Sequence, residues 1–188
     1  MKCPPVLAFV FSCGFLLAGC GPQQPATNAT SATNAAAPPA REAPARGPDG
    51  PIVQAQPKLQ SIKIYLGPRE LNTELALTDQ QRMTGMMFRT NIAETESMLF
   101  VFPVPFQAGF WMKNVTVPLS AAYIDPEGTI LEIHNLEPGN TNSVQADSNR
   151  IQYVLETAQG WFQRNGVSTG AVIRTDRGSF AETFRWKR

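Results

Sequence analysis

Apolar and polar residues alternate along this chain from about Leu59 onward, and this two-residue period is the feature that most constrains its fold. Side chains two apart on a strand share one face of a sheet, so the alternation predicts half-buried β-strands. Turn-forming pairs such as Gly67-Pro68 separate the strands and favour hairpins. The predicted strands span residues 62–66, 70–77, 98–102, 109–114, 121–125, 129–134, 151–156 and 171–174.

Two short helices are expected among these strands. Thr78 and Gln81 have the spacing of a capping box, which predicts that a helix carrying three methionines begins there. A second helix is expected over 157–165, before Gly166. Because hairpins dominate and no strand–helix–strand rhythm is present, the sheet should be largely antiparallel. The sequence therefore predicts an α+β fold, mainly antiparallel β, forming one compact barrel-like or sandwich domain over 59–175.

The N-terminus has the features of a lipoprotein signal peptide. Lys2 supplies a positive charge, and the apolar run 6–18 is shorter than the ~20 residues that a membrane-spanning helix needs. The run ends in the tetrapeptide Leu-Ala-Gly-Cys, which is the pattern of a bacterial lipobox. We therefore expect residues 1–19 to be cleaved and Cys20 to carry the lipid. The alternatives are an ordinary signal peptide with an incidental cysteine, or an anchor that is never cleaved.

A lipidated Cys20 would hold the protein on a membrane without spanning it, since acyl chains contribute ~0.8 kcal/mol per buried methylene. The predicted location is the bacterial cell envelope, and Gly21 favours the outer membrane, facing the periplasm, in a host with two membranes. Residues 20–58 are rich in Pro, Ala, Asn, Thr and Gln, so beyond the lipidated cysteine they should form a disordered tether. Residues 176–188 are predicted to be a tail. Its aromatic and basic side chains suit a bilayer surface or a partner, but a frayed end is favoured.

The cysteines and the charge exclude several functions. Cys3 and Cys13 leave with the signal peptide and Cys20 is lipidated, so thiol catalysis, cysteine zinc sites and disulfides are excluded. A formal net charge of +1 gives no support for a nucleic-acid partner. The methionines after Thr78 have no His or Cys beside them, which favours a core-facing stripe over a soft-metal site. No metal or cofactor is expected.

Several blocks of sequence occur in an order that resembles one family. The blocks are MMFR (86–89), MLFVF (98–102), FWMKN (110–114), VLE (154–156) and GVSTG (166–170). Together they are similar to the family called domain of unknown function 192 (DUF192), over residues 62–173. The resemblance implies a small, mainly β domain that often follows a signal or lipoprotein peptide, and it implies no established activity. Two departures stand out: Ser120 replaces the usual Asp, and 141–150 lacks the usual Tyr and Pro, so a site built from them would be altered or lost.

Two hydrolase hypotheses arise from the residues. Gly166–Gly170 matches the G-x-S-x-G motif of serine hydrolases, but that motif needs a strand before the serine and a histidine after it. The sole histidine, His134, lies upstream, where alternation places it beside Glu132 as a solvated strand residue. The glycines are then best explained by a turn. A carboxylate-dependent hydrolase acting on an envelope glycan stays open, with Asp125, Glu132 and Glu156 as candidate residues.

Three charged residues, Arg89, Lys113 and Glu156, lie inside apolar runs. An isolated buried ion costs several kcal/mol, so each of them should find a partner. One interpretation is a structural cluster in which Arg89 makes a bidentate ion pair with Glu156. The other is a polar site where Arg89 and Lys113 bind an anionic or sugar-like ligand and Trp111 stacks on it. Asn114, the remaining candidate, is expected to cap the following turn.

Alternation also divides the run that contains Trp111. Phe110, Met112 and Asn114 should share the buried face, and Trp111 and Lys113 should share the other. The sequence as a whole favours a lipid-anchored envelope protein that binds or scaffolds rather than catalyses. An envelope glycan, an anionic ligand and a protein are its candidate partners, besides the membrane itself.

Overall fold

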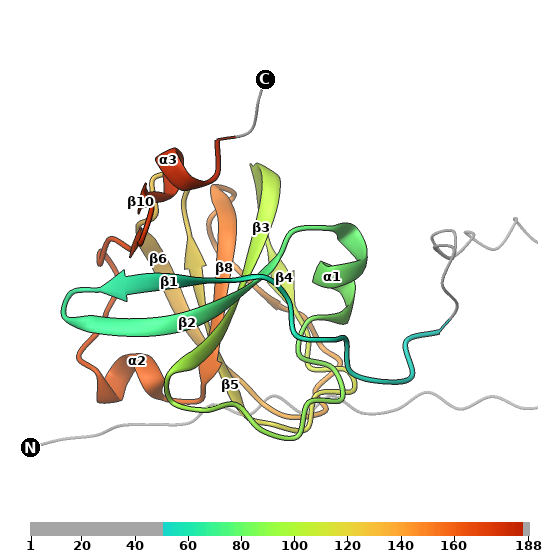
Figure 1. Cartoon of the computed structure of the whole chain (residues 1–188). Helices are drawn as coiled ribbons and strands as arrows, with labels where there is room; N and C mark the ends of the chain where they lie inside the picture. Colours follow the sequence, from blue (N-terminus) through green and yellow to red (C-terminus); the bar gives the residue numbers. More distant parts are fainter. Residues whose placement is uncertain (1–50, 186–188) are drawn as a thin grey trace, which may run out of the picture. The chain divides into compact units, whose positions relative to one another are not determined.

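The structure of this chain is a computed structural model that describes residues 51–185 (Figure 1). The predicted signal peptide, the lipid attachment at Cys20 and most of the predicted tether lie outside the described residues. Within 51–185, no helix is long and apolar enough to cross a membrane.

An eight-stranded, mostly antiparallel sheet forms the centre of the fold, as predicted. The strand order is β10-β9-β1-β2-β3-β8-β5-β6, in which β2 and β3 run parallel and the other neighbours run antiparallel. A separate two-stranded pair joins β4 and β7. The strands are β1 (Ser61–Leu66), β2 (Arg69–Ala76), β3 (Glu96–Phe106), β4 (Gly109–Phe110), β5 (Leu119–Ile124), β6 (Ile130–Leu136), β7 (Val144–Gln145), β8 (Ile151–Ala158), β9 (Arg174–Thr175) and β10 (Gly178–Ser179). The helices are α1 (Asp79–Thr84), α2 (Trp161–Arg164) and α3 (Phe180–Thr183), one more than the sequence predicted.

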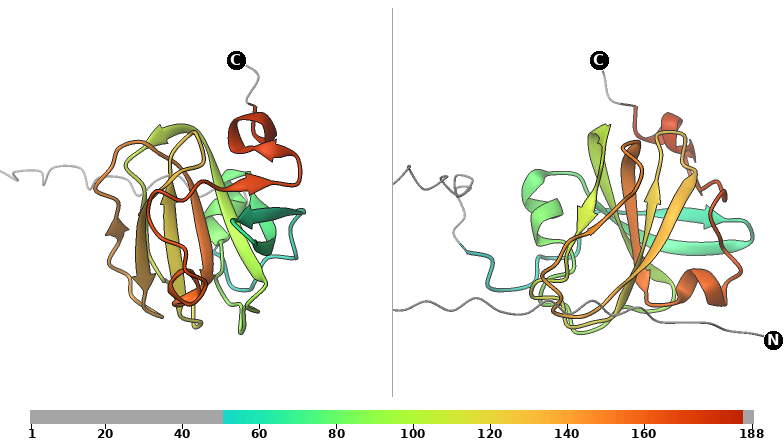
Figure 2. Two further views of the ribbon diagram at one scale, coloured as in Figure 1. Left: turned by 90° about the vertical axis from the view of Figure 1, so that its left-hand side faces the viewer. Right: turned by 180° about the vertical axis from the view of Figure 1, so that it is seen from behind.

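The sheet curls but does not close into a barrel. The β1–β2 hairpin crosses the direction of the other strands, as Figures 1 and 2 show. The segment before β9 joins the two edges of the sheet: Ile173 N donates to Gly128 O, and Ile130 N donates to Ala171 O, both at 2.9 Å. Because these are isolated hydrogen bonds and not a continuous ladder, the architecture is a sandwich-like α+β fold.

Apolar side chains cover both faces of the sheet, since successive residues of a strand point to opposite sides. The first core includes Ile62, Ile64, Leu71, Leu75, Leu99, Val101, Tyr153, Leu155, Trp161, Phe162, Ile173 and Phe180. The second core includes Met86, Met87, Met98, Phe100, Met112, Leu119, Ala121, Tyr123, Leu136, Ile151 and Val154. The methionine stripe predicted to face a core therefore does so at Met86 and Met87, whereas Met83 is exposed. Both cores lie within 51–185, so this part of the chain carries a complete interior of its own.

The ordered domain begins before residue 59, where the sequence placed its boundary. Ile52 and Leu59 pack against the second core. Gln56 Nε2 donates to Gln81 O at 3.2 Å, which also accepts from Gly85 N, and to Gly85 O at 2.9 Å, so it bonds two carbonyls at the end of α1. Residues 51–58 were predicted to be tether because they contain few large apolar residues. They are held by the packing of Ile52 and by the hydrogen bonds of Gln56, which composition does not reveal.

Helix α1 begins with the capping box that the sequence predicted. The Thr78 hydroxyl accepts from Gln81 N, and Gln81 Oε1 accepts from Thr78 N. Replacing Thr78 with Ala should lower the free energy of unfolding by about 1 kcal/mol, because the helix loses one satisfied amide at its start. Urea denaturation measures the loss, and Thr78→Ser, which keeps the hydroxyl, is the control. Equal stability of the Ala and Ser variants would contradict this role for the cap.

The C-terminal end differs most from the sequence prediction. We expected a frayed tail from residue 176, but β10 and α3 form there. Ser179 and Glu182 make a second capping box, and Phe180 is fully buried against Tyr153, with the ring centroids 4.8 Å apart. Phe184, four residues after Phe180, adds an apolar contact on the same side of α3. Over 176–185 the frayed end is not found, because two apolar residues are enough to dock a single helical turn when a core faces them.

The second predicted helix is shorter than expected. Strand β8 continues to Ala158, and α2 occupies only Trp161–Arg164 within the predicted 157–165. Gly160 adopts a φ of 75°, a left-handed conformation that suits glycine, and it separates the strand from the helix. The chain therefore turns sharply here and places Trp161 and Phe162 in the first core.

Candidate functional site

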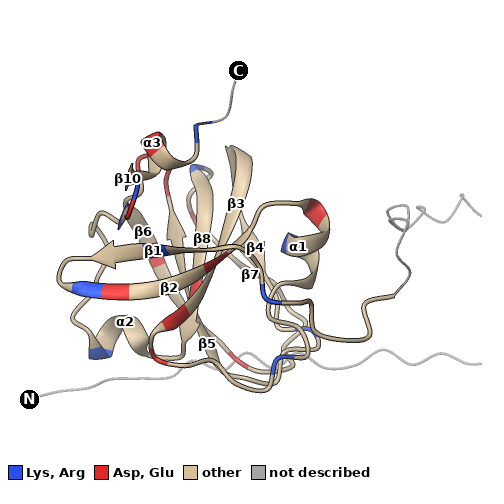
Figure 3. Ribbon diagram, viewed as in Figure 1, with Lys and Arg blue, Asp and Glu red and all other residues tan. Residues whose placement is uncertain are grey.

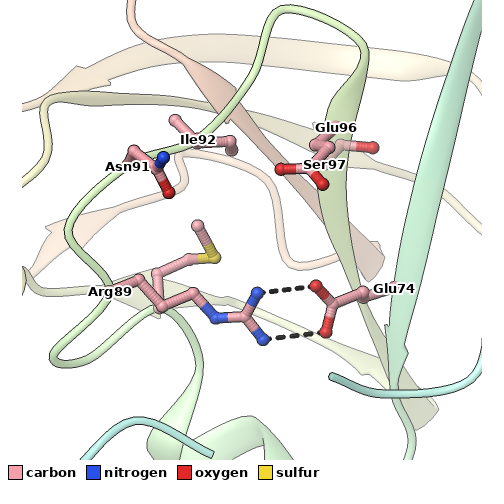
Figure 4. A pocket seen from close by; sticks show the side chains of 7 residues that line it. Glu74, Arg89, Asn91, Ile92, Glu96 and Ser97 are labelled. Carbon is pink, nitrogen blue, oxygen red and sulfur yellow. Dashed lines mark hydrogen bonds and ion pairs between the residues drawn. The ribbon is translucent and has the colours of Figure 1, made fainter. Parts of the chain in front are cut away.

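Arg89 forms a bidentate ion pair, but its partner is Glu74 and not the predicted Glu156. Arg89 Nη1 lies 2.6 Å from Glu74 Oε1, and Nη2 lies 2.8 Å from Oε2 (Figure 4). The side chains are 12% and 8% exposed. The pair joins the segment after α1 to β2, so the structural interpretation of Arg89 is correct in kind and wrong in its partner.

Glu74 also holds the segment that enters the domain. Its Oε2 accepts from Leu59 N at 2.8 Å, and Lys58 Nζ lies 3.6 Å from Oε1 and 2.8 Å from Glu96 Oε1. Burial alone would raise the pKa of Glu74, but the hydrogen bonds from Arg89 and Leu59, with the charges of Arg89 and Lys58, outweigh it. The pKa of Glu74 therefore lies below its ordinary value. Its carboxylate is charged while it binds Arg89, Lys58 and the amide of Leu59.

The hollow beside this ion pair is very small. It is lined by Glu74, Met86, Arg89, Asn91, Ile92, Glu96 and Ser97, and its volume is about 10 Å³ (Figure 4). That is room for about one water molecule. Arg89 Nε is buried without a hydrogen-bond partner. The Arg89–Glu74 pair is thus a structural ion pair, and the hollow beside it has no room for an organic ligand.

Glu74 was missed because the sequence placed it on the polar face of its strand. Alternation over 70–77 put Leu75 inside and Glu74 outside. In the structure residues 73–76 are all buried, because this half of β2 has the first core on one side and the chain entry on the other. Nothing in the local sequence distinguishes Glu74 from Glu70 or Glu96. Its role depends on a partner fifteen residues away.

Glu156 lies alone in the second core. Its strand places it between Met98 of β3 and Ala121 of β5, in the same register row as Glu74. The residue is 3% exposed, and its Oε2 has no hydrogen-bond partner. Burial raises the pKa of Glu156 from 4.5 to about 8. The carboxyl is therefore mostly protonated at neutral pH, which explains how it survives in an apolar layer without a cation.

Trp111 and Lys113 share the exposed face, as alternation predicted. Trp111 is 48% exposed, and Lys113 Nζ lies 5.4 Å from the centroid of its ring, a cation–π distance. The residue between them, Met112, is 1% exposed, and its amide donates to Asn140 O at 2.7 Å. Strand β4 ends at Phe110, so these residues belong to a loop and not to the predicted strand. The buried Met112 and its hydrogen bond to Asn140 fix the loop to the domain, while the side chains of Trp111 and Lys113 face solvent.

Asn114 does not share the buried face of Phe110 and Met112. It is exposed and has a φ of 59°, a left-handed conformation that asparagine tolerates better than most residues. Its carbonyl accepts from Phe88 N at 2.8 Å. The side-chain alternation fails at Asn114 because the backbone leaves the extended conformation there. A turn at this position, which the sequence did predict, is present.

The five predicted site residues therefore occupy separate places. Arg89 is buried against Glu74, Glu156 is enclosed in the second core, and Trp111, Lys113 and Asn114 lie on one exposed loop. No single concavity gathers them. Figure 3 shows that charged residues of both signs are spread over the domain, with acidic ribbon on β2 and β3 near the entry segment. Within 51–185, no group of three or more His, Cys, Asp and Glu side chains is arranged to hold a metal ion.

The remaining hydrolase candidates have structural partners. Asp125 Oδ1 accepts from Glu127 N and Thr129 N, which closes the β5–β6 turn. Glu132 accepts from two loop amides and lies 3.0 Å from His134 Nε2, as their shared face predicted. Burial would raise the pKa of Glu132, but hydrogen bonds from His134 and those amides lower it overall. Ser168 is exposed, and the left-handed Gly166 and Gly170 beside it fit the turn hypothesis.

Ser120 and the loop 141–150, where the chain departs from the resembled pattern, also have structural roles. The Ser120 hydroxyl accepts from Gly160 N at 2.9 Å and lies 2.7 Å from Asn135 Oδ1. The loop forms β7, and Ala146 N donates to Ala108 O at 2.8 Å. Ser120 is 1% exposed, so it links β5 to the start of α2 without reaching solvent.

The profile of one family matches residues 62–175 of this chain, which is most of the described domain; the family is DUF192, described as an uncharacterised ACR. The chain belongs to the DUF192 family. No curated protein matches it. The DUF192 fold is also found in two similar crystal structures, both of bacterial proteins.

The first is a protein from Sinorhizobium meliloti 1021 whose name proposes it as a transcription regulator. It has a TM-score of 0.61 and 31% identity, over 64% of this chain and 98% of its own. The second is a protein of unknown function from Novosphingobium aromaticivorans DSM 12444, with a TM-score of 0.59 and 27% identity, over 71% of this chain and 94% of its own. The relatives thus cover the domain and add no established activity to this DUF192 member.

Proposed function

We propose that this DUF192 protein is a lipid-anchored module of the bacterial envelope that binds an anionic glycan through the exposed pair Trp111 and Lys113. The observation that carries the proposal is the half-exposed indole of Trp111, stacked with an ammonium group on a loop fixed from beneath. A flat apolar ring packs against the apolar face of a sugar, and an adjacent cation attracts a carboxylate or phosphate on it. Tryptophan is also among the residues most often found to dominate binding energy.

Rigidity of the loop supports this role. Gly109 and Phe110 pair with β7, Phe88 N donates to Asn114 O at 2.8 Å, and Gly139 N donates to Val115 O at 3.0 Å. A loop held on both sides loses little conformational entropy when a ligand stacks on its aromatic residue. The exposed Trp111 is then preorganised for a partner, because its backbone is already fixed in the free protein.

Membrane attachment through Cys20 rests on the sequence pattern Leu-Ala-Gly-Cys and on the short apolar run before it. The disordered character expected for the following residues suits a tether that lets the domain reach its ligand in the envelope. The Sinorhizobium relative's name suggests a role in transcription, but this chain has a formal net charge of +1 and offers no excess of positive charge for a nucleic acid. We therefore place the protein in the envelope as a binding module.

A hydrolase is the weaker alternative, because its candidate carboxyls are committed elsewhere. Asp125 and Glu132 accept hydrogen bonds from backbone amides, and Glu156 is 3% exposed. Glycoside hydrolysis needs two carboxyl groups that flank the substrate, both within reach of it. A raised pKa alone does not make Glu156 a general acid when no substrate reaches its carboxyl.

Replacing Trp111 with Ala should weaken binding of an anionic envelope polysaccharide by at least about 30-fold, or about 2 kcal/mol, since the stacking surface is removed. Isothermal titration calorimetry with residues 51–188 measures the affinity of each variant for the polysaccharide. Trp111→Phe should keep part of the affinity, and Lys113→Gln should weaken binding of anionic but not neutral glycans, less so at high salt.

Phe106→Ala is the matched control, because it removes an aromatic side chain that is 38% exposed and lies outside the loop. It should bind the glycan as the unaltered protein does. Two results would overturn the proposal: failure of the unaltered domain to bind any anionic envelope glycan, or full binding by Trp111→Ala with the fold intact by circular dichroism.

A further inference from the structure

A groove lies between the segment that enters the domain and helix α1. Residues 51–57 with Leu59 line one side of it, and Gln80, Gln81 and Thr84 of α1 line the other. Figure 1 shows the entry segment, in cyan, passing beneath α1. The volume of the groove is about 520 Å³, within the ~300–1,000 Å³ that is typical of small-molecule sites. An organic ligand therefore fits here, although none fits the hollow beside Arg89.

The described residues that line the groove carry no charge. Its polar side chains are amides and one hydroxyl, from Gln54, Gln56, Gln80, Gln81 and Thr84, and the others are aliphatic or proline. A charged ligand would leave water here without a counter-ion, which is unfavourable. The groove therefore suits an uncharged ligand that combines apolar surface with hydrogen-bonding groups.

Gln56 and Gln81 each have one end of the side-chain amide fixed by the backbone. Gln56 Nε2 donates to Gln81 O at 3.2 Å and to Gly85 O at 2.9 Å. Gln81 Oε1 accepts from Leu77 N at 2.8 Å and from Thr78 N at 3.0 Å. The other ends, Gln56 Oε1 and Gln81 Nε2, have no hydrogen-bond partner in the part of the chain that the structure describes. An acceptor and a donor are thus held in place on two residues that contact each other, and each is free to bind a ligand.

One acceptor beside one donor matches a secondary amide, which carries an N–H and a carbonyl. An acetamido group also brings a methyl group, which suits aliphatic lining residues such as Ala55 and Leu59. A bound peptide would instead use its backbone along its length, usually against the edge of a sheet. Here one side of the groove is a helix, whose backbone groups bond one another. The lining therefore favours a compact ligand with an acetamido group, such as an N-acetylated sugar, over an extended peptide.

We propose that this groove binds an uncharged N-acetylated sugar, with the acetamido N–H donating to Gln56 Oε1 and the acetamido carbonyl accepting from Gln81 Nε2. Both contacts use groups whose orientation is already fixed in the free protein, so little conformational entropy is lost when the sugar binds. The groove shares no described residue with the loop that carries Trp111 and Lys113, so this site is independent of the proposed function.

Isothermal titration calorimetry of residues 21–188, which keep the chain on both sides of the groove, tests the site with tri-N-acetylchitotriose. The unaltered protein should bind this sugar at least about tenfold more tightly than cellotriose, which has hydroxyl groups in place of the acetamido groups. Gln81→Glu should lower the affinity by about tenfold or more, because it replaces the free donor with a carboxylate oxygen. It keeps the oxygen that caps α1, so the fold should be unchanged. The matched control is Gln163→Glu, the same change at an exposed glutamine of α2, which should bind normally.

Three results contradict this site: no binding of either sugar, equal affinity for both, or equal affinity of Gln81→Glu and Gln163→Glu for tri-N-acetylchitotriose. Binding of N-acetylalanine N-methylamide in place of the sugar would also overturn it, since that result assigns the groove to a peptide. Trp111→Ala should keep the preference for tri-N-acetylchitotriose over cellotriose, and Gln81→Glu should bind an anionic polysaccharide without acetamido groups normally. The two proposals can therefore fail separately.

Discussion

Stability of the Glu156→Gln variant relative to the unaltered protein should rise by about 5 kcal/mol between pH 4 and pH 9. Burial raises the pKa of Glu156 to about 8 in the folded protein, against an ordinary value of 4.5. A raised folded pKa contributes stability that is fully present below pH 4.5 and is lost as the pH rises through about 8, because only the folded state retains the proton in that window. A shift of this size corresponds to ~1.4 kcal/mol per unit. A glutamine side chain does not titrate in this range, so the variant does not lose this contribution to stability as the pH rises.

Urea denaturation of both proteins at intervals from pH 4 to pH 9, followed by circular dichroism, measures the difference. Only the difference between the two proteins is diagnostic, because other carboxyls change stability with pH in both. Parallel pH profiles would show that Glu156 titrates normally in the folded state and is not enclosed as the structure has it. With typical domain stabilities of ~5–15 kcal/mol, the unaltered protein should become marginal at alkaline pH.

The second large effect is expected at the Arg89–Glu74 pair. Glu74→Gln should lower the free energy of unfolding by about 3–5 kcal/mol at pH 7, because it leaves a largely buried guanidinium without its counter-ion. The double variant Glu74→Leu/Arg89→Met should recover a large part of that loss, since two apolar side chains have no unpaired charge. Urea denaturation again measures the effect. Proteolysis should also become faster near Leu59, whose amide is held by Glu74.

Glu70→Gln is a control on the same strand. Glu70 pairs with Lys63 at 2.7 Å, but both side chains are about half exposed, so the loss should be under about 1 kcal/mol. If Glu70→Gln and Glu74→Gln cost the same, the buried position of the Arg89 pair would be contradicted. The pH dependence runs opposite to that of Glu156: the pKa of Glu74 is lowered, so its contribution is present above pH 4.5 and is lost as the pH falls through the folded value.

These two carboxyls show how one register row of the sheet supports different chemistry. Glu74 and Glu156 lie on the same face, one strand apart on either side of Met98. Glu74 is charged because Arg89 and a backbone amide reach it, whereas Glu156 has no partner and keeps its proton. The strand register alone gave them equivalent positions. Their protonation differs because Arg89 and Leu59, from segments outside the sheet, reach Glu74, whereas Glu156 lies between Met98 and Ala121.

The local sequence determined the elements that depend on near neighbours. Thr78 and Gln81 start α1 because a capping box needs only residues three apart. Alternation placed Met112 inside and Trp111 with Lys113 outside, since neighbouring side chains on an extended backbone must diverge. The order of the family's sequence blocks also indicated DUF192, which the profile match over 62–175 established.

Only the tertiary structure decided which distant residues meet. Glu74 pairs with Arg89, Phe180 docks on Tyr153, and Gln56 binds the end of α1, and each contact closes a loop of 15 residues or more. Local sequence patterns do not identify such partners, because the burial of a residue depends on chain segments that are distant in sequence. The sequence by itself therefore determined most of the long strands, the cap of α1 and the exposed face that Trp111 shares with Lys113. The packing of the second core and the entry segment decided that Arg89 and Glu156 are enclosed parts of the fold, and left the Trp111 loop and the groove beside α1 open to ligands.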